Sequence, residues 1–307
     1  MMATRDAITP LKIIALACLV NIVGDAAMCV WPFRLGTSGA AAATAFATLF
    51  SSGFMLKSLK KKGILPKVRL PTKKELFGVL EFTGPLLAIT VTRLIGLVNM
   101  QQKAMSFGVK STAAYQLAYN LLMFFLLFGE PLSQVSQTQL PSLIDKNDGP
   151  RARATFKSAL VLGGIVSVAV GVIASSLLWF GTGLFTSDLQ VQALARSVTP
   201  AFFGGVVSAI FAVAVDGAML ASRDFGFMLF QGSMTMLLQA KLLSSYCVTL
   251  SDVFHTWTIR LGSYAVFSLL RIVIGHGPLG RVIRSSTGSS NGSDFEGLSK
   301  INGAPAS

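Results

Sequence analysis

Long apolar stretches separated by short polar connections dominate the sequence. A window of about 20 residues, which as a helix crosses roughly 30 Å of hydrocarbon, finds eight such stretches. They predict an all-α polytopic membrane protein with about eight transmembrane helices, over residues 11–31, 38–56, 75–100, 112–140, 158–180, 197–221, 224–244 and 255–275. The last two stretches contain the most polar residues, so an interfacial helix is the alternative interpretation for each of them.

The composition supports a membrane protein. Of the 307 residues, 52% are hydrophobic and 13% are charged, whereas roughly a quarter of the residues are charged in an ordinary soluble domain. The mean hydropathy is +0.64. A soluble fold needs a charged exterior, so this composition excludes a disordered chain and disfavours a soluble globular domain.

The positive charge is unevenly distributed along the chain. There are 26 Lys and Arg residues against 13 Asp and Glu, a net charge of +13, which in a soluble protein would suggest a nucleic-acid partner. If the chain crosses the membrane eight times, most basic residues fall in connecting segments on the same side of the membrane, most densely between Lys57 and Lys74. By the positive-inside rule both termini lie on the inner side. We therefore expect membrane lipids, not nucleic acid, as the partner of the basic loop.

The same loop divides the chain. It is the longest polar connection and contains Pro66 and Pro71. The predicted organisation is a pair of helices over 1–56, a basic inner loop over 57–74, a six-helix bundle over 75–284 and a disordered polar tail over 285–307.

Targeting and metal signals are weak. We recognise no cleavable signal or transit peptide before the first span. The cysteines Cys18, Cys29 and Cys247 show no C-x-x-C spacing, and His255 and His276 have no partner at ligand spacing. We therefore expect neither a disulfide framework nor a metal site.

Ionisable residues inside the predicted spans are the candidate functional residues, because a charge at the bilayer centre costs a few kcal/mol unless it is paired or hydrated. In the first span Asp25 follows Asn21 by four residues, so both lie on one helix face. Such a pair could hold a proton or a small cation. The alternative is that Asp25 lies near the outer end of the span and only reaches the interface.

Arg93 lies deep in the third span. Its planar guanidinium suits a carboxylate or phosphate ligand. The alternative is an ion pair with Glu130 or Asp25 from a neighbouring helix, and the two roles do not exclude each other.

A polar break interrupts the fourth span. Glu130 lies between Gly129 and Pro131, and a stripe of hydroxyl and amide side chains follows, including Gln134 and Gln137. This pattern is typical of a helix interrupted at a cavity, as found at the binding sites of secondary transporters.

Asp216 lies near the inner end of the sixth span and is followed by Arg223 and Asp224. Two interpretations stand for it: a residue of a transport site, or a member of a charge cluster at the end of the helix.

Several motifs resemble one family. The runs GEPLSQVSQTQLPSL, RARATFKSAL and VDGAMLASRDF are similar to the multidrug and toxic compound extrusion (MATE) family, and most similar to its plant and algal plastid branch of the enhanced-disease-susceptibility type. NIVGDAA and GTSGAAAAT resemble the fifth and sixth helices of that family, and Trp257 with Arg271 resembles the end of its twelfth. The resemblance covers about residues 11–275.

The resemblance implies a fold of twelve helices in two six-helix lobes. This chain would then correspond to helices five to twelve, which makes it an N-terminally truncated member of the family. Asn21, Asp25 and Thr44 match the cation or proton site in the first lobe of prokaryotic relatives. Where many relatives carry a carboxylate, eight residues after the proline of the seventh helix, this chain has Arg93.

The predicted function is a secondary active transporter, a cation-coupled antiporter that exports an organic solute. Charge complementarity with Arg93 favours an anionic solute. The cation or proton site would be Asn21, Asp25 and Thr44, and the substrate cavity would contain Arg93, Glu130, Gln134, Gln137 and Asp216. No cofactor is expected beyond the coupling H⁺ or Na⁺.

Two other functional classes compete with the transporter. A membrane enzyme is disfavoured because no Asp-rich diphosphate motif, metal-spaced histidines or Ser–His arrangement is visible. A truncated or non-transporting membrane protein that pairs with another chain is the alternative function. The branch resemblance suggests the plastid envelope as the location.

Overall fold

The computed structural model describes residues 8–30, 34–63 and 72–284, and every structural statement below concerns these residues. Their regular structure is helical throughout. The chain divides into two compact units, residues 1–75 and 76–307, which are described one at a time. The tail predicted at 285–307 and part of the predicted basic loop, residues 64–71, lie outside the described residues.

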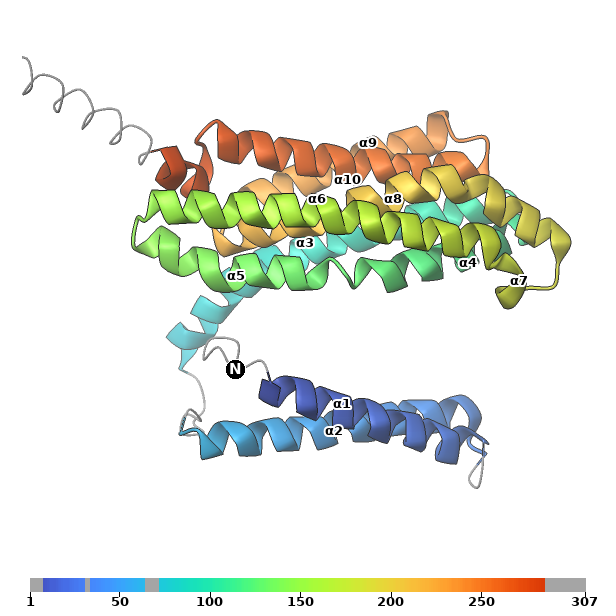
Figure 1. The fold of residues 1–307 in the computed structure, drawn as a ribbon, viewed down its shortest axis with the longest axis horizontal. Helices are drawn as coiled ribbons and strands as arrows, with labels where there is room; N and C mark the ends of the chain where they lie inside the picture. The colour runs from blue at the N-terminus through green and yellow to red at the C-terminus, as the bar shows by residue number, and fades with distance from the viewer. Residues whose placement is uncertain (1–7, 31–33, 64–71, 285–307) are drawn as a thin grey trace, which may run out of the picture. The chain divides into compact units, whose positions relative to one another are not determined.

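The first unit contains a helical hairpin. Helix α1 (Ile8–Asp25) continues into a single π-helical segment, η2 (Ala26–Val30), and the chain returns as α2 (Gly36–Lys61) beside α1 (Figure 1). Gly39, Ala43 and Ala47 are the buried residues of α2 and repeat every four residues. Small residues at this spacing let two helices approach closely in a membrane. The loop predicted over 57–74 is shorter than expected, because α2 continues to Lys61 and the next helix begins at Lys73.

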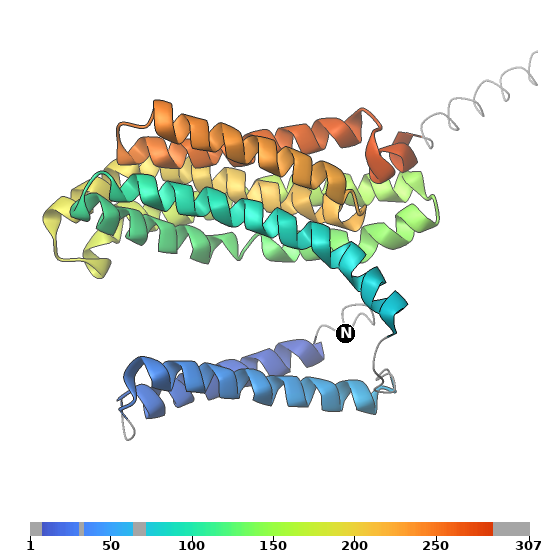
Figure 2. The same ribbon diagram turned by 180° about the vertical axis from the view of Figure 1, so that it is seen from behind.

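The second unit is a bundle of long helices (Figures 1 and 2). Its elements are α3 (Lys73–Met105, whose first residues belong to the first unit), α4 (Val109–Leu126), α5 (Glu130–Asp145), α6 (Gly149–Phe180), the short α7 (Thr182–Phe185), α8 (Leu189–Ala221), α9 (Phe225–Ser245) and α10 (Leu250–Val273). Helix α8 is central and packs against α4, α5, α6 and α10. It is apolar nearly all round, as expected of a helix surrounded by others.

The core of this unit contains large side chains from several helices. Tyr115 of α4, Phe202 of α8 and Phe254 of α10 are fully buried in one cluster, and Met100 of α3 reaches the same cluster. Figure 2 shows α3 on the face of the bundle turned toward the viewer in that view. Side chains therefore tie α3 to the core.

The predicted break in the fourth span is confirmed. Helix α4 ends at Leu126, three residues form turns, and α5 begins at Glu130 with Pro131 in its first turn. Proline lacks a backbone N–H and is favoured at this position of a helix. The two pieces together form one rod, which is the predicted span over 112–140.

The all-α polytopic fold is confirmed. Each of the eight predicted spans coincides with a helix or with two consecutive helices. Among the described residues, six segments are long and apolar enough to cross a membrane, and α10 with residues 277–284, bent by 41°, makes a seventh. Helix α9 does not meet this criterion of length and apolar composition, and it contains Gln231, Gln239 and Lys241.

Side chains cap the N-termini of α6, α8 and α10. Asp148 and Asp188 accept backbone N–H bonds at the starts of α6 and α8. Before α10, Thr249 and Asp252 form a reciprocal capping box. Each cap satisfies one or two of the free N–H groups of the first turn.

Candidate functional site

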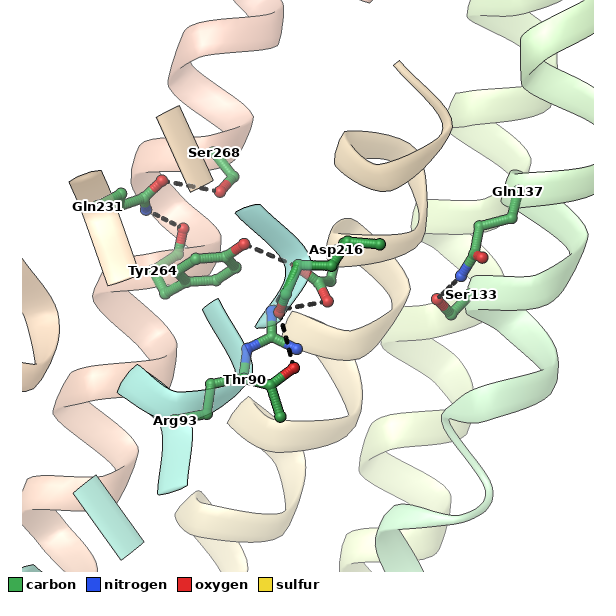
Figure 3. A network of polar contacts seen from close by, with 9 residues as sticks. Thr90, Arg93, Ser133, Gln137, Asp216, Gln231, Tyr264 and Ser268 are labelled. Atoms are coloured by element: carbon green, nitrogen blue, oxygen red, sulfur yellow. Dashed lines mark hydrogen bonds and ion pairs between the residues drawn. The ribbon is translucent and has the colours of Figure 1, made fainter. Parts of the chain in front are cut away.

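Three helices of the second unit meet at one ionic cluster (Figure 3). Nη2 of Arg93 in α3 donates to both carboxylate oxygens of Asp216 in α8, at 2.8 Å each. The hydroxyl of Tyr264 in α10 donates to Oδ1 of Asp216 at 2.7 Å. Asp216 therefore links α3 to α10, and its charge is matched by one guanidinium and one neutral donor.

The partners of this ion pair differ in exposure. The side chain of Asp216 is 9% exposed and that of Arg93 is 48% exposed. Both bonds to Asp216 come from Nη2, so within the described residues the Nε and Nη1 groups of Arg93 have no protein acceptor. The carboxylate depends on the pair for its charge compensation, whereas the guanidinium retains free donors.

These contacts correct two sequence-based alternatives. The partner of Arg93 in this unit is Asp216 and not Glu130. Asp216 does not belong to a charge cluster at the end of α8 either. Asp224, which directly precedes α9, is paired with Arg271 of α10, whose Nε lies 2.7 Å from Oδ2 of Asp224. The two ion pairs share no residue.

A cavity of about 180 Å³ lies beside the cluster. Helices α3, α4, α8, α9 and α10 all contribute to its wall. Its polar lining includes Arg93, Asp216, Tyr264 and Arg260, and most of its other lining residues are apolar, among them Ile89, Leu97, Met123, Leu126, Trp257 and Leu261. The site combines a mainly apolar wall with a few polar groups, the usual composition of a small-molecule pocket.

Arg260 is a site residue that the sequence interpretation did not select. Its side chain is buried, with 3% exposure. Nη1 donates to Oε1 of Gln239 in α9 at 2.9 Å, and Nη2 donates to the backbone oxygen of Thr92 in α3 at 3.4 Å. A sequence signal exists: Trp257, Arg260 and Tyr264 are spaced by three and four residues, which places all three on one face of α10.

The guanidinium of Arg260 passes directly over the backbone of α3. A Cβ atom at Gly96 would lie 1.6 Å from Nη1 of Arg260, closer than any two non-bonded atoms can come. Any larger residue at this position would require the guanidinium of Arg260 to move.

The polar stripe of α5 lies elsewhere. Glu130, Gln134 and Gln137 are exposed on the second unit and are not among the residues that line the cavity. Gln137 donates to Oγ of Ser133 at 2.9 Å, within α5, as Figure 3 also shows. Ser133 itself is buried against Gly217 of α8. The structure thus brings Arg93 and Asp216 together and leaves the other three predicted cavity residues apart from them.

The predicted cation-site residues lie together in the first unit. Nδ2 of Asn21 in α1 donates to Oγ1 of Thr44 in α2 at 3.2 Å. Asp25 is the last residue of α1, directly before the π-helical segment, and its buried Oδ1 has no hydrogen-bond partner within the described residues. Single π-helical turns are frequent at functional sites, and a buried polar atom without a partner calls for an explanation such as a bound ion or water. Across the described ranges, no three His, Cys, Asp or Glu side chains come together as metal ligands.

Comparisons with known proteins agree with this architecture. No profile of a protein family matches the chain. Protein DETOXIFICATION 47, chloroplastic, of Arabidopsis thaliana is 27% identical over 221 residues, covering 71% of this chain and 40% of that protein. Protein DETOXIFICATION 42 of the same plant is 27% identical over 282 residues, covering 89% of this chain and 53% of that protein.

The solved structures show the same fold. The crystal structure of MATE in complex with MaL6 superposes with a TM-score of 0.71 at 16% sequence identity, over 84% of this chain and 60% of that one. The chain is therefore a polytopic all-α membrane protein with the fold of the MATE transporters. The resemblance to the MATE family indicated by its motifs is confirmed, with chloroplastic plant proteins among its relatives. The matched proteins are named as DETOXIFICATION and MATE proteins and not as enzymes, which agrees with the sequence argument against an enzyme.

Proposed function

We propose that this chain takes part in cation-coupled export of an organic anion across a membrane. The chain spans about half or less of the curated relatives described above, so the activity of a whole transporter is a proposal for it. The observation that carries the proposal is Arg93, whose side chain is half-exposed and whose guanidinium is held by Asp216 at a mainly apolar cavity with two donor groups free. Free guanidinium donors suit the planar oxygens of a carboxylate or sulfonate.

The coupling ion has a separate candidate site. The hydrogen bond between Asn21 and Thr44 and the unpartnered Oδ1 of Asp25 support binding of H⁺ or Na⁺ in the first unit. Ion binding at Asp25 would favour one conformation of the transporter and the organic anion the other, each only by the difference between its affinities for the two. Glu130, Gln134 and Gln137, exposed on the second unit, are proposed to contact solute during its passage.

Transport into proteoliposomes tests the proposal. The probe is benzenesulfonate, which stays charged at neutral pH and does not cross lipid unaided, with its neutral analogue benzenesulfonamide as the matched solute. We expect an imposed H⁺ or Na⁺ gradient to drive movement of benzenesulfonate. Asp25→Asn should abolish the dependence on the gradient, and Arg93→Gln should lower the rate at low solute concentration by roughly tenfold or more, because charge-assisted hydrogen bonds are lost. Arg151→Gln, at an arginine that is 81% exposed, is the control. Equal transport by Arg93→Gln and the unchanged chain would contradict the role of Arg93.

A second candidate function is retained because of the coverage of the relatives. A membrane protein that does not transport by itself, and that pairs with another chain, would also span only part of those relatives. Co-purification with a tagged second chain from the same membrane would support this candidate, and gradient-driven transport by the purified chain alone would exclude it.

The membrane is proposed to be the plastid envelope, with both termini on the inner side. The chloroplastic relatives and the clustering of basic residues around Lys57–Lys62 support this placement. Protease accessibility of a C-terminal tag in intact plastids tests it.

A further inference from the structure

The cavity beside the ion pair of Arg93 and Asp216 contains one more positive charge than negative charge. Arg93 and Asp216 form an ion pair and offset each other. Arg260, which lines the same cavity, is 3% exposed and has no carboxylate within salt-bridge distance among the described residues. Arg271 of the same helix, by contrast, is paired with Asp224. Arg260 is thus a buried cation in a membrane-spanning helix without a compensating anion.

Such a residue is costly unless something compensates it. Taking a charge out of water carries a large desolvation penalty, and a buried charge is normally paired. The acceptors of Arg260, the amide oxygen of Gln239 and the backbone oxygen of Thr92, are both neutral. They use two of the five N–H groups of the guanidinium. The remaining N–H groups and the full charge are left for a ligand.

The neighbouring polar groups are donors as well. Nε2 of Gln239 and Nε1 of Trp257 are buried and have no acceptor in the described part of the chain. The ring of Trp257 lies 6.0 Å from Cζ of Arg260. A group of donors without acceptors suits a ligand rich in acceptor oxygens and does not suit a cation.

We propose that Arg260 is the principal anion anchor of this cavity, and that its ligand is a compact organic anion whose apolar body packs against Trp257 and the aliphatic wall. In this arrangement Arg93, already bonded to Asp216, is a secondary contact. The cavity of about 180 Å³ is smaller than the 300–1,000 Å³ usual for drug-sized ligands, so the ligand is about the size of a single substituted ring. This inference deepens the proposed function and rests on it for the identity of the transported solute. Binding itself can be measured without transport.

The binding experiment uses the full chain in detergent micelles and the fluorescence of Trp257. Replacing the other two tryptophans, Trp31 and Trp179, by phenylalanine leaves Trp257 as the single reporter at the cavity wall. Benzenesulfonate is titrated, with benzenesulfonamide as the neutral probe of the same size and inorganic sulfate as the probe without an apolar body. We expect saturable binding of benzenesulfonate, and much weaker binding of the other two.

The variants separate the two arginines. Arg260→Gln should weaken benzenesulfonate binding by at least about tenfold and leave sulfonamide binding unchanged, because the charge-assisted bonds are lost. Arg260→Lys keeps the positive charge but lacks the planar guanidinium, so its benzenesulfonate affinity should lie between that of the unchanged chain and that of Arg260→Gln. Arg93→Gln should weaken binding less than Arg260→Gln, and Arg151→Gln, at an exposed residue that does not line the cavity, should not change it. If Arg260→Gln does not give a monodisperse protein, Arg260→Lys takes its place. The inference then requires Arg260→Lys to lose more benzenesulfonate affinity than Arg93→Gln.

Three results would overturn the inference. They are unchanged benzenesulfonate affinity in Arg260→Gln, equal affinity for the sulfonate and the sulfonamide, or a larger loss in Arg93→Gln than in the Arg260 variants. Equal affinity for sulfate would overturn the organic nature of the ligand. If the chain binds benzenesulfonate through Arg260 but does not move it in proteoliposomes, the proposed function fails and this inference stands. If transport is gradient-driven but unchanged by substitution of Arg260, the proposed function stands and this inference fails.

Discussion

The ion pair of Arg93 and Asp216 makes a quantitative prediction about stability. Its two partners are unequally exposed, 48% for Arg93 and 9% for Asp216. Removing one partner of a buried pair costs about 3–5 kcal/mol, because the other charge is left buried and unpaired. Exposed pairs contribute only about 0–1 kcal/mol. The cost of each single substitution therefore depends on which charge stays behind.

Arg93→Gln leaves the buried carboxylate of Asp216 with only the hydroxyl of Tyr264 as a donor. We expect a loss of roughly 2–4 kcal/mol in the free energy of unfolding, slightly below the range for fully buried pairs. Asp216→Asn leaves Arg93, whose half-exposed side chain also lines the cavity, so the loss should be smaller, about 1–2 kcal/mol. The double variant leaves no unpaired charge and should lose less than the sum of the two single losses, by about 1–2 kcal/mol.

Unfolding in mixed micelles with increasing denaturing detergent, followed by tryptophan fluorescence, measures all four members of this cycle. Tyr264→Phe provides a matched control, because it removes a neutral donor from the same carboxylate and should cost only about 1–2 kcal/mol. If Asp216→Asn costs as much as Arg93→Gln, the argument from unequal burial is wrong. Additive single losses would show that the two side chains do not interact.

Three further substitutions test the packing. Gly96→Ala should destabilise the second unit by about 1–3 kcal/mol, because its Cβ would lie 1.6 Å from Nη1 of Arg260, and the lost stability should return in Gly96→Ala/Arg260→Ala. Gly217→Ala should cost a similar amount, because its Cβ would lie 2.5 Å from Cα of Ser133, whereas Gly164→Ala, with nothing within 4 Å, should cost nothing or stabilise. Thr249→Ala should lower the free energy of unfolding by about 1 kcal/mol through loss of the capping box. Thermal unfolding of the purified chain measures each of them, and an unchanged midpoint for Gly96→Ala would contradict the close passage of Arg260 over α3.

Much of the fold follows from one-dimensional patterns in the chain. The eight apolar stretches predict the eight helical segments, because a backbone in hydrocarbon must satisfy its own hydrogen bonds and a helix does so within one segment. The sequence Gly129-Glu130-Pro131 predicts the break between α4 and α5 for an equally local reason, since proline cannot donate a backbone hydrogen bond. Motif resemblance pointed to the MATE family, and the matches to plant relatives and to a MATE structure agree with it.

The composition of the candidate site required the tertiary structure. Arg93 and Asp216 are 123 positions apart, and helical periodicity states which face a residue occupies but not which helix that face meets. The sequence therefore offered Glu130 as a partner for Arg93, whereas the structure gives Asp216, and Glu130 lies exposed on another helix. The resemblance to the MATE family, and not a pattern in the residues themselves, grouped Asn21 with Thr44, and a hydrogen bond between two consecutive helices joins them.

Arg260 illustrates the same limit. The sequence shows an arginine flanked by Trp257 and Tyr264 on one face of a helix, and this pattern is equally compatible with an interfacial helix whose arginine reaches water. Only the packing of α10 against α8, with α3 and α9 around the cavity, buries that face. Local hydrogen bonding and hydropathy thus determined where the helices are, and the packing of helices far apart in the chain decided which charges are paired and which one is left for a ligand.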